Sequence, residues 1–477
     1  MASENAPTIL WFRRDLRLSD HPGWTAALAR GGPVIPVFVL DPLIEESYGR
    51  APKWRLGLGL EAFGKALVER GSRLILRRGE ALAVLRSLIE ETGARGVVWS
   101  RVYDPDGIAR DTDVKAALKD DGVEAQSVNA SLLFEPWTVE TKTGGFYKVY
   151  TPFWKGVRGT DPGEPVAAPG SLVPPDAWPA SDDLSDWKLA EGMNRGAEVV
   201  SRFVNVGEAA ALGRLSAFCS GAIGTYGVDR DRPDLDGTSN LSENFTYGEL
   251  SPRTAWAAGM SARERLSGRE AESAEVFLQE LAWREFSYHL LYHTPRLVTG
   301  NWREEWDAFP WREDNEDATR WKRGMTGFEM VDAGMREMYV TGRMHNRMRM
   351  LTASLLTKHL MTDWRVGEAW FRDCLVDWDI AANAMGWQWS AGSGPDATPY
   401  FRVFNPITQA DKFDKNATYR HRFLAEGRRN PHKDAVAFFE AAPRSWRLDL
   451  SAPYPAPVIG HKEGRERALE AYRNRAA

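Results

Sequence analysis

Two aspartates and an asparagine lie close together in the last third of the chain. Asp377 and Asp379 are two residues apart, and Asn383 follows Asp379 by one helical turn, within the run DWRVGEAWFRDCLVDWDIAANAMGWQWS. Carboxylates and an amide in an apolar, helical stretch are costly to bury unless they pair or bind a ligand. Metal binding is the competing interpretation, but none of the eight histidines joins these carboxylates locally. The hydrogen-bonding edge of a buried heterocycle fits this group better.

Tryptophan is unusually frequent, with 20 residues in a chain of 477. A buried indole needs a partner for its N–H and a large matching void, so a merely stable core uses Leu, Ile and Val more often. The tryptophan content therefore indicates either a large aromatic ligand or electron transfer through indoles.

A second group of polar residues lies in the helical segment EVFLQELAWREFSYHLL. Glu280, Trp283 and Arg284 stand at positions i, i+3 and i+4 and therefore share one helix face. A carboxylate, an indole and a guanidinium together can bind a base edge, stack on its ring and hold a phosphate. The commoner explanation of such a triplet is a surface ion pair beside a half-buried tryptophan.

The segment TGRMHNRMRML repeats this spacing with Asn346, Arg349 and Met350, while Arg347 points elsewhere and is free to reach a phosphate. Methionine suits an apolar wall against a planar ligand, although a methionine at helical spacing is usually plain core. Upstream, the hydroxyl groups of the stretch 236–242 precede a short helical pattern. They predict either a phosphate cradle or ordinary helix capping.

Composition excludes several classes of protein. The chain has 43% hydrophobic residues, a net charge of −5 and two widely spaced cysteines, Cys219 and Cys374. A disulfide framework, a cysteine-based zinc site and an iron–sulfur cluster are therefore not expected. Because the sequence contains neither a secretory signal nor an apolar run long enough to cross a bilayer, we expect a cytoplasmic protein without a membrane segment.

The pattern of elements predicts an α/β part followed by an all-α part. Residues 1–140 alternate short apolar runs with amphipathic segments, which indicates a Rossmann-like domain with a parallel sheet, although no G-x-G-x-x-G follows the first run. We expect a long Pro-rich linker over 141–204 and an all-helical domain over 205–477. The expected strands are Thr8–Phe12, Pro33–Leu40, Arg73–Arg78 and Gly96–Ser100.

Long motifs along the whole chain resemble those of the photolyase/cryptochrome family. They are WFRRDLRLSDHP, YKVYTPFW, DGTSNLS, ELAWREF, MHNRMRM and WQWSAGSGPDATPYFRVFNP. Within the family the chain is most similar to class I cyclobutane pyrimidine dimer (CPD) photolyases. The resemblance implies a U-shaped FAD in the helical domain, active as FADH⁻.

The resemblance also assigns roles to individual residues. Asn383 would face N5 of the flavin, and Arg349 would pair with Asp377. The residues implied in cofactor binding are Tyr226, Thr238, Ser239, Leu241, Ser242, Phe277, Arg284, Arg349, Asp377, Asp379 and Asn383. Those implied in catalysis are Glu280, Asn383 and the electron-transfer tryptophans Trp311, Trp364 and Trp387. Those implied in binding the lesion or the DNA backbone are Arg230, Glu280, Trp283, Asn346, Arg347, Met350, Trp389 and Gln409.

The implied activity is that of a deoxyribodipyrimidine photo-lyase, a monomer that repairs UV-damaged DNA. Excited FADH⁻ would give an electron to a flipped-out dimer, the ring would open and the electron would return. The alternatives are a cryptochrome-like blue-light photoreceptor and, without the resemblance, a helical nucleic-acid-binding module. Gly144 and Gly145 depart from the pattern of folate-binding relatives, so the antenna stays open between folate, a deazaflavin, another flavin and none. Met385 also departs from many relatives, close to the expected flavin.

Overall fold

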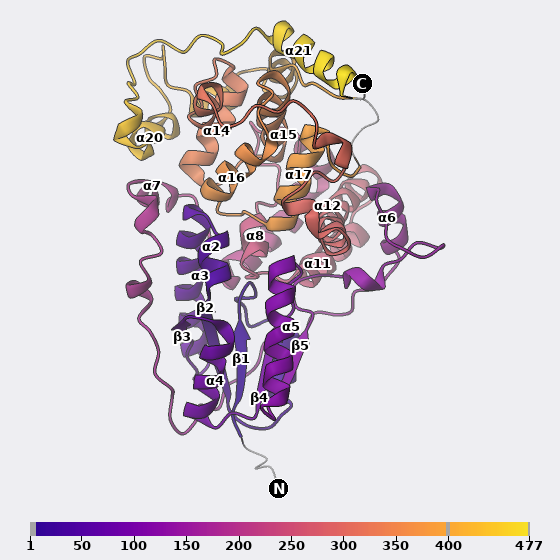
Figure 1. Ribbon diagram of the computed structural model, residues 1–477, viewed down its shortest axis with the longest axis vertical. Helices are drawn as coiled ribbons and strands as arrows, with labels where there is room; N and C mark the ends of the chain where they lie inside the picture. Colours follow the sequence, from indigo (N-terminus) through magenta and orange to yellow (C-terminus); the bar gives the residue numbers. More distant parts are fainter. Residues whose placement is uncertain (1–5, 397–400, 476–477) are drawn as a thin grey trace.

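The computed structural model describes residues 6–396 and 401–475, which form two lobes (Figure 1). The lower lobe in this view contains the β-sheet and the N-terminus, and the upper lobe consists of helices. Within the described residues, no helix has both the length and the apolar character needed to span a bilayer.

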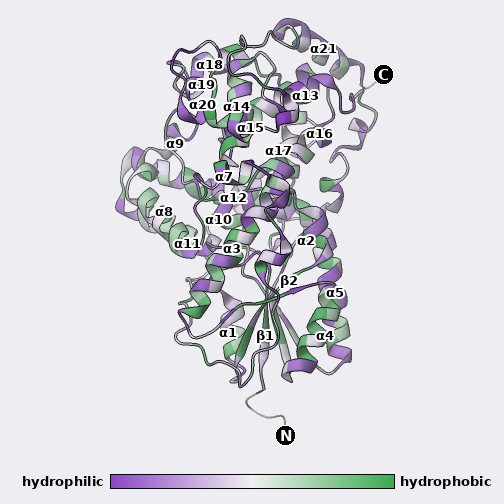
Figure 2. Ribbon diagram, turned by 90° about the vertical axis from the view of Figure 1, so that its left-hand side faces the viewer, coloured by the Kyte–Doolittle hydropathy of each residue, from purple (hydrophilic) through white to green (hydrophobic). Residues whose placement is uncertain are grey.

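The lower lobe is built on a five-stranded parallel sheet with the order β3-β2-β1-β4-β5. Every residue of β1, β2 and β4 is buried, as expected for parallel strands that helices cover on both faces. Figure 2 shows these hydrophobic strands between helices with polar outer faces. The strands are β1 (Thr8–Phe12), β2 (Val34–Leu40), β3 (Ile75–Arg78), β4 (Gly96–Ser100) and β5 (Glu124–Val128).

Local capping signals position the helices of this lobe. Asp41 and Asp104 each accept a hydrogen bond from the first turn of the helix that follows, and a proline occupies the first helical position. Both features favour a helix start. The helices are α1 (Pro22–Leu28), α2 (Pro42–Ser47), α3 (Arg50–Val68), α4 (Ala81–Thr92) and α5 (Pro105–Asp120).

The connecting segment between the lobes lies against the edge of the sheet. It contains α6 (Tyr150–Val157) and α7 (Gly196–Val200), joined by a mostly irregular run on the left of Figure 1. Within this run Asp182 N donates to Leu76 O of β3 at 2.8 Å, and Leu76 N donates to Ser181 Oγ at 2.9 Å. The run therefore covers an edge strand that would otherwise expose backbone hydrogen-bonding groups.

The upper lobe is helical. Among the described residues beyond 204 no strand occurs, and one isolated bridge joins Arg312 to Thr362. The predicted fold class, a parallel-sheet lobe followed by an all-helical lobe, is confirmed. The helices are α8 (Glu208–Ser220), α9 (Tyr226–Asp229), α10 (Ser242–Thr246), α11 (Pro252–Arg265), α12 (Gly268–His293), α13 (Glu316–Lys322), α14 (Glu329–Thr341), α15 (Asn346–Ser354), α16 (Trp364–Cys374), α17 (Ile380–Ala391), α18 (Pro406–Phe413), α19 (Thr418–Phe423), α20 (Lys433–Ala441) and α21 (His461–Asn474).

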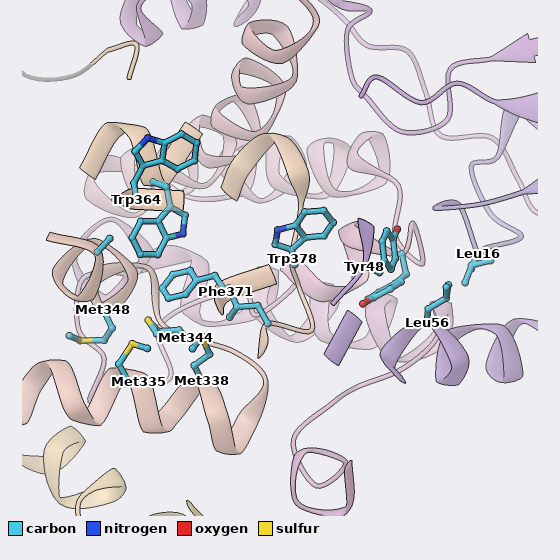
Figure 3. Packing of buried hydrophobic residues seen from close by; sticks show 14 of the residues in the cluster. Leu16, Tyr48, Leu56, Met335, Met338, Met344, Met348, Trp364, Phe371 and Trp378 are labelled. Atoms are coloured by element: carbon cyan, nitrogen blue, oxygen red, sulfur yellow. The ribbon is translucent and has the colours of Figure 1, made fainter. Parts of the chain in front are cut away.

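One hydrophobic cluster extends through both lobes. It includes Leu16 and Leu56 of the lower lobe and Trp364 and Trp378 of the upper lobe. Figure 3 shows Tyr48 between these two sets, and its ring centroid lies 5.8 Å from that of Trp378 in an edge-on contact. The lobes therefore share a core.

A buried arginine joins the lobes as well. Arg55 on α3 is fully buried and binds both carboxylate oxygens of Glu249, at 2.9 and 2.7 Å. Its Nε lies 3.6 Å from Oε2 of Glu243, on α10 of the upper lobe. One guanidinium thus neutralises two carboxylates that have no access to water.

Replacing Arg55 by methionine leaves the buried Glu249 without its charge partner and leaves Glu243 with Arg214 alone. We expect Arg55→Met to lower the free energy of unfolding by about 3–5 kcal/mol, the usual cost of breaking a buried ion pair from one side. Urea unfolding measures this loss. Lys65→Met is the matched control, because Lys65 lies on the same helix and its pair with Glu61 is exposed. Equal unfolding midpoints for the two variants would contradict this role of Arg55.

Candidate active site

The upper lobe contains a cavity of about 1250 Å³. This volume exceeds the roughly 300–1000 Å³ of ordinary ligand pockets, so the cavity has room for a large ligand and a second molecule. Helices α12, α15 and α17, which cluster in the upper lobe of Figure 1, contribute side chains to its wall, together with the stretch 233–246.

Most of the predicted site residues line this one cavity. They are Tyr226, Arg230, Thr238, Ser239, Leu241, Ser242, Phe277, Glu280, Trp283, Arg284, Asn346, Arg349, Met350, Asp377, Asp379, Asn383, Trp387 and Trp389. The predicted residues Trp311, Arg347, Trp364 and Gln409 are not part of its wall.

Asp379 begins the helix that carries several of these residues. Its side chain accepts hydrogen bonds from the backbone N–H groups of Ala381 and Ala382, at 3.1 and 3.0 Å. Arg14 of the lower lobe donates to the same carboxylate at 2.6 Å, and the Tyr288 hydroxyl group also donates to it. The sequence interpretation placed both aspartates within a helix; instead Asp379 is the N-cap of α17 and Asp377 precedes it.

These partners keep Asp379 ionised. Burial acts to raise the pKa of Asp379, but attraction to Arg14 and Arg284 together with the hydrogen bonds that the carboxylate accepts outweighs burial, and the pKa lies below its ordinary value. A negative charge at the start of a helix also interacts favourably with the helix dipole. The interaction with Arg14 therefore makes part of the site depend on the lower lobe.

Asp377 has an arginine of its own. Arg349 Nη2 donates to both oxygens of Asp377, at 2.9 and 2.7 Å, and Arg349 Nε donates to Met344 O at 2.8 Å. The pairing that the resemblance implied is thus present in the structure. Both aspartates line the cavity. Each pairs with a different arginine, and the two do not form a joint metal site. Among the described residues no cluster of His, Cys, Asp or Glu could hold a metal ion.

Asn383 is oriented by a carboxyl group that sequence reasoning missed. Asn383 Nδ2 donates to Glu368 Oε1 at 3.1 Å, and Trp378 Nε1 lies 3.4 Å from the same oxygen. Burial raises the pKa of Glu368 above its ordinary value. Glu368 lies 15 residues before Asn383, on α16, so no local spacing pattern pointed to it.

The predicted phosphate cradle is a loop that precedes a short helix, as the sequence indicated, but no side chain of the loop caps that helix. Thr238, Ser239 and Ser242, which we call the hydroxyl loop, line the cavity. Helix α10 has only five residues, and its N-cap is Leu241, whose side chain makes no capping bond. The hydroxyl groups can still donate hydrogen bonds to a ligand. Arg343 also lines the cavity, and we had not assigned it a role in the site.

Trp283 is held from behind by a tyrosine of the connecting segment. The rings of Tyr150 and Trp283 are stacked, with centroids 3.7 Å apart and planes 8° from parallel. The Tyr150 hydroxyl group donates to Gln279 O on the same helix as Trp283, at 2.6 Å. Stacking on this side fixes the indole plane, while Trp283 also forms part of the cavity wall.

The tryptophans assigned to electron transfer lie at and behind the cavity wall. Trp387 is buried, and its Nε1 finds no acceptor among the described residues. Its ring contacts Gly367, where an added Cβ would lie 2.0 Å from the indole, so only glycine permits this packing. Gly367 lies on α16, which begins at the fully buried Trp364, and Trp364 Nε1 donates to Asn301 at 2.9 Å. Trp311 is half-buried and stacks on Trp306, with centroids 6.1 Å apart.

The lining fits the dinucleotide that the sequence predicted. Asp377, Asp379 and Asn383 offer hydrogen-bonding groups to a heterocycle and its sugars, and the hydroxyl loop and Arg284 offer donors to phosphates. The unsatisfied indole N–H of Trp387 adds a buried donor near the cavity. This combination of polar groups with a large volume suits FAD better than a small ligand.

Loss of Arg14 weakens the start of α17. We expect Arg14→Met to lower the free energy of unfolding by about 1.5–3 kcal/mol, the usual contribution of a hydrogen bond to a charged group. Hydrogen–deuterium exchange should become faster in Ile380–Ala391. Arg30→Met is the control, because Arg30 pairs with Glu124 elsewhere in the lower lobe. Unchanged protection of α17 in Arg14→Met would show that this contact does not stabilise the helix.

Comparison with known proteins identifies the family. Residues 8–170 match the family model described as DNA photolyase, and residues 277–474 match the FAD binding domain of DNA photolyase. The chain is 46% identical to a deoxyribodipyrimidine photo-lyase of Agrobacterium fabrum, over 99% of this chain and 98% of that protein. It is 33% identical to Cryptochrome-1 of Arabidopsis thaliana, over 97% of this chain and 70% of that protein.

A solved structure has the same fold. It is a bacterial class III photolyase from Agrobacterium tumefaciens, with a TM-score of 0.91 and 44% identity over all of this chain and 99% of that one. The sequence resemblance had pointed to class I within the family, whereas this neighbour belongs to class III. The family itself is confirmed: the chain belongs to the photolyase/cryptochrome family and carries the FAD binding domain of DNA photolyase.

Proposed function

We propose that this protein is a deoxyribodipyrimidine photo-lyase that repairs cyclobutane pyrimidine dimers in DNA with blue light. One observation carries the proposal. A single cavity brings the residues assigned to the cofactor together with Glu280, Trp283, Met350 and Trp389, the residues assigned to the lesion. The relatives named deoxyribodipyrimidine photo-lyase support it.

The cofactor end of the cavity is formed by Asp377, Asp379, Asn383 and the hydroxyl loop. Bound FAD, reduced and excited by light, supplies the electron that opens the dimer and takes it back afterwards. Arg349 and Arg14 hold the two carboxylates in place through ion pairs, and Glu368 orients the amide of Asn383. An amide beside the flavin offers hydrogen bonds without a readily released proton.

The lesion end presents aromatic and apolar surfaces with a few polar groups. Trp283 and Trp389 stack on the flipped-out dimer, and Met350 forms an apolar wall. Glu280 and Asn346 hydrogen-bond to the bases. A fused dimer stacks and pairs poorly with its neighbours. Flipping it out of the duplex therefore costs less free energy than flipping normal bases. The apolar, tryptophan-rich wall excludes water from the reacting groups.

Trp387, Trp364 and Trp311 pass an electron inward from the surface. This order is supported by their positions, since Trp387 lines the cavity, Trp364 is fully buried outside its wall and Trp311 is partly exposed. Arg230, Arg347 and Gln409 bind the DNA backbone near the lesion. The protein acts as a cytoplasmic monomer, with an antenna-type domain over 1–140, a linker over 141–204 and the catalytic domain over 205–477.

A cryptochrome-like photoreceptor is the second candidate, because Cryptochrome-1 is also among the relatives. A thymine oligonucleotide with one cyclobutane dimer separates the two functions. Blue light should convert the dimer to separate thymines in the presence of the purified holoprotein, and a dark sample is the control. A holoprotein that responds to light but leaves the dimer intact would favour the photoreceptor.

The electron route generates a first prediction. Trp387→Phe removes the indole of the proposed electron route that lines the cavity, so light should no longer bleach the absorption of the oxidised flavin. Repair by chemically reduced protein should stay largely intact. Trp24→Phe, a buried tryptophan of the lower lobe, is the control and should bleach normally. Bleaching at the wild-type rate in Trp387→Phe would show that electrons take another route.

The lesion pocket generates a second prediction. Trp283→Ala should weaken binding to dimer-containing DNA by about 1–3 kcal/mol, the usual contribution of one base–aromatic stack. Fluorescence anisotropy with damaged and undamaged duplexes measures this loss. Trp137→Ala is the control, because Trp137 is partly exposed on the surface outside the cavity. Unchanged affinity in Trp283→Ala would remove this residue from the pocket.

A further inference from the structure

The cavity residue Glu280 is paired with an arginine that we assign to DNA. Arg230 Nη1 lies 2.5 Å from Glu280 Oε1, and both side chains line the cavity. A second pair lies beside the first, since Arg347 Nη2 is 2.5 Å from Oδ1 of Asp231. Both arginines proposed to bind DNA are therefore neutralised by carboxylates in the DNA-free protein.

DNA phosphates compete for these arginines. The Arg230 and Glu280 side chains are 22% and 27% exposed, so an approaching phosphate can reach the guanidinium. Arginine binds phosphate through two parallel hydrogen bonds, which makes phosphate an effective replacement for a single carboxylate contact. When Arg230 turns to the backbone, Glu280 loses its nearest positive charge.

The surroundings of Glu280 then favour its neutral form. Burial raises the pKa of Glu280, Arg230 lowers it and the nearby Asp231 raises it. The other titratable groups around it are the hydroxyl groups of Tyr226 on α9 and Tyr150 on α6, whose pKa values burial raises, so both remain neutral. Once Arg230 has moved away, neither Asp231 nor the two tyrosines stabilise the ionised form of Glu280.

We propose that Arg230 moves from Glu280 to a DNA phosphate when the lesion binds, and that Glu280 then takes up one proton from solvent. This inference rests on the proposed function. An O–H bond forms on the Glu280 carboxyl group with a proton from the buffer, Arg230 stays protonated and no electron moves. Only the neutral carboxyl group can donate a hydrogen bond to a carbonyl oxygen of the dimer, so the exchange prepares the pocket for its substrate.

The exchange makes binding depend on pH. The pKa of Glu280 is higher in the complex than in the free protein, so binding takes up a proton and the affinity falls as pH rises. Between the two pKa values the affinity should fall about tenfold per pH unit. His345, Asp396 and Glu337 also line the cavity and are further candidates for proton uptake. Burial lowers the pKa of His345 to about 4 and raises the pKa of Asp396 above its ordinary value.

Calorimetry of the holoprotein in the dark tests the exchange. A duplex with one thymine dimer is titrated in two buffers of different ionisation enthalpy, and the difference in heat gives the number of protons taken up. Wild-type protein should take up about one proton per bound lesion. Glu280→Gln should take up none, because the amide is neutral in both states. Arg230→Met should also take up little, because its Glu280 is already protonated before DNA binds.

Two variants show whether the proton goes to Glu280. Glu275→Gln is the matched control on the same helix, where Glu275 pairs with Arg263 at 2.9 Å, and it should keep the wild-type uptake. Asp396→Asn should keep it as well. Uptake that persists in Glu280→Gln would overturn the proposal, and so would wild-type binding to the lesion without uptake. If the wild-type protein does not prefer damaged over undamaged DNA, the proposed function itself fails.

Discussion

The hydrogen-bonded carboxylate of Asp379 connects the two lobes to the cavity. It accepts from Arg14 of the sheet lobe, from Tyr288 on α12 and from the first amides of α17. Because the carboxylate caps α17, these contacts fix where the helix begins and therefore where its later turns lie. Asn383, Trp387 and Trp389 follow on this one helix, and we assign them to the cofactor, the electron route and the lesion pocket. A single capped helix thus sets the relative positions of three proposed functions.

Ion pairs with arginines allow carboxylates to line a cavity whose wall is otherwise largely apolar. Isolated charges are expensive to bury, and Asp377, Asp379 and Glu280 each pair with a different arginine. The carboxylates of Asp377 and Asp379, at the proposed cofactor end, are only 3% and 12% exposed. The Glu280 carboxylate, at the end assigned to the lesion, is 27% exposed. This difference explains why the first pairs act as fixed supports and why Arg230–Glu280 is suited to exchange.

Local sequence patterns predicted the strands and helix faces that depend on residues close together in the chain. The strands Thr8–Phe12 and Gly96–Ser100 were found from their apolar runs, and the spacing of Glu280, Trp283 and Arg284 correctly placed all three on the cavity. Strand β5 was missed because its sequence, EAQSV, is short, polar and at the sheet edge. The hydroxyl loop was correctly placed before a short helix, whereas the alternative of ordinary capping by its side chains is not observed.

The missed contacts of the site are long-range. Arg14 lies 365 residues from Asp379, and Tyr150 is 133 positions before Trp283, so no helical or strand period relates them. The family resemblance pointed to the residues proposed to touch ligands, whereas the residues that hold them in place emerged from the fold. Glu368 is such a case, since its bond to Asn383 depends on the packing of α16 against α17.

The central claim is that the flavin and the lesion share one cavity at a distance suited to electron transfer. The fluorescence lifetime of the reduced flavin in the holoprotein tests it most directly. We predict that a bound oligonucleotide with a cyclobutane dimer shortens this lifetime, and that the undamaged oligonucleotide does not. An unchanged lifetime with the lesion fully bound would contradict the account.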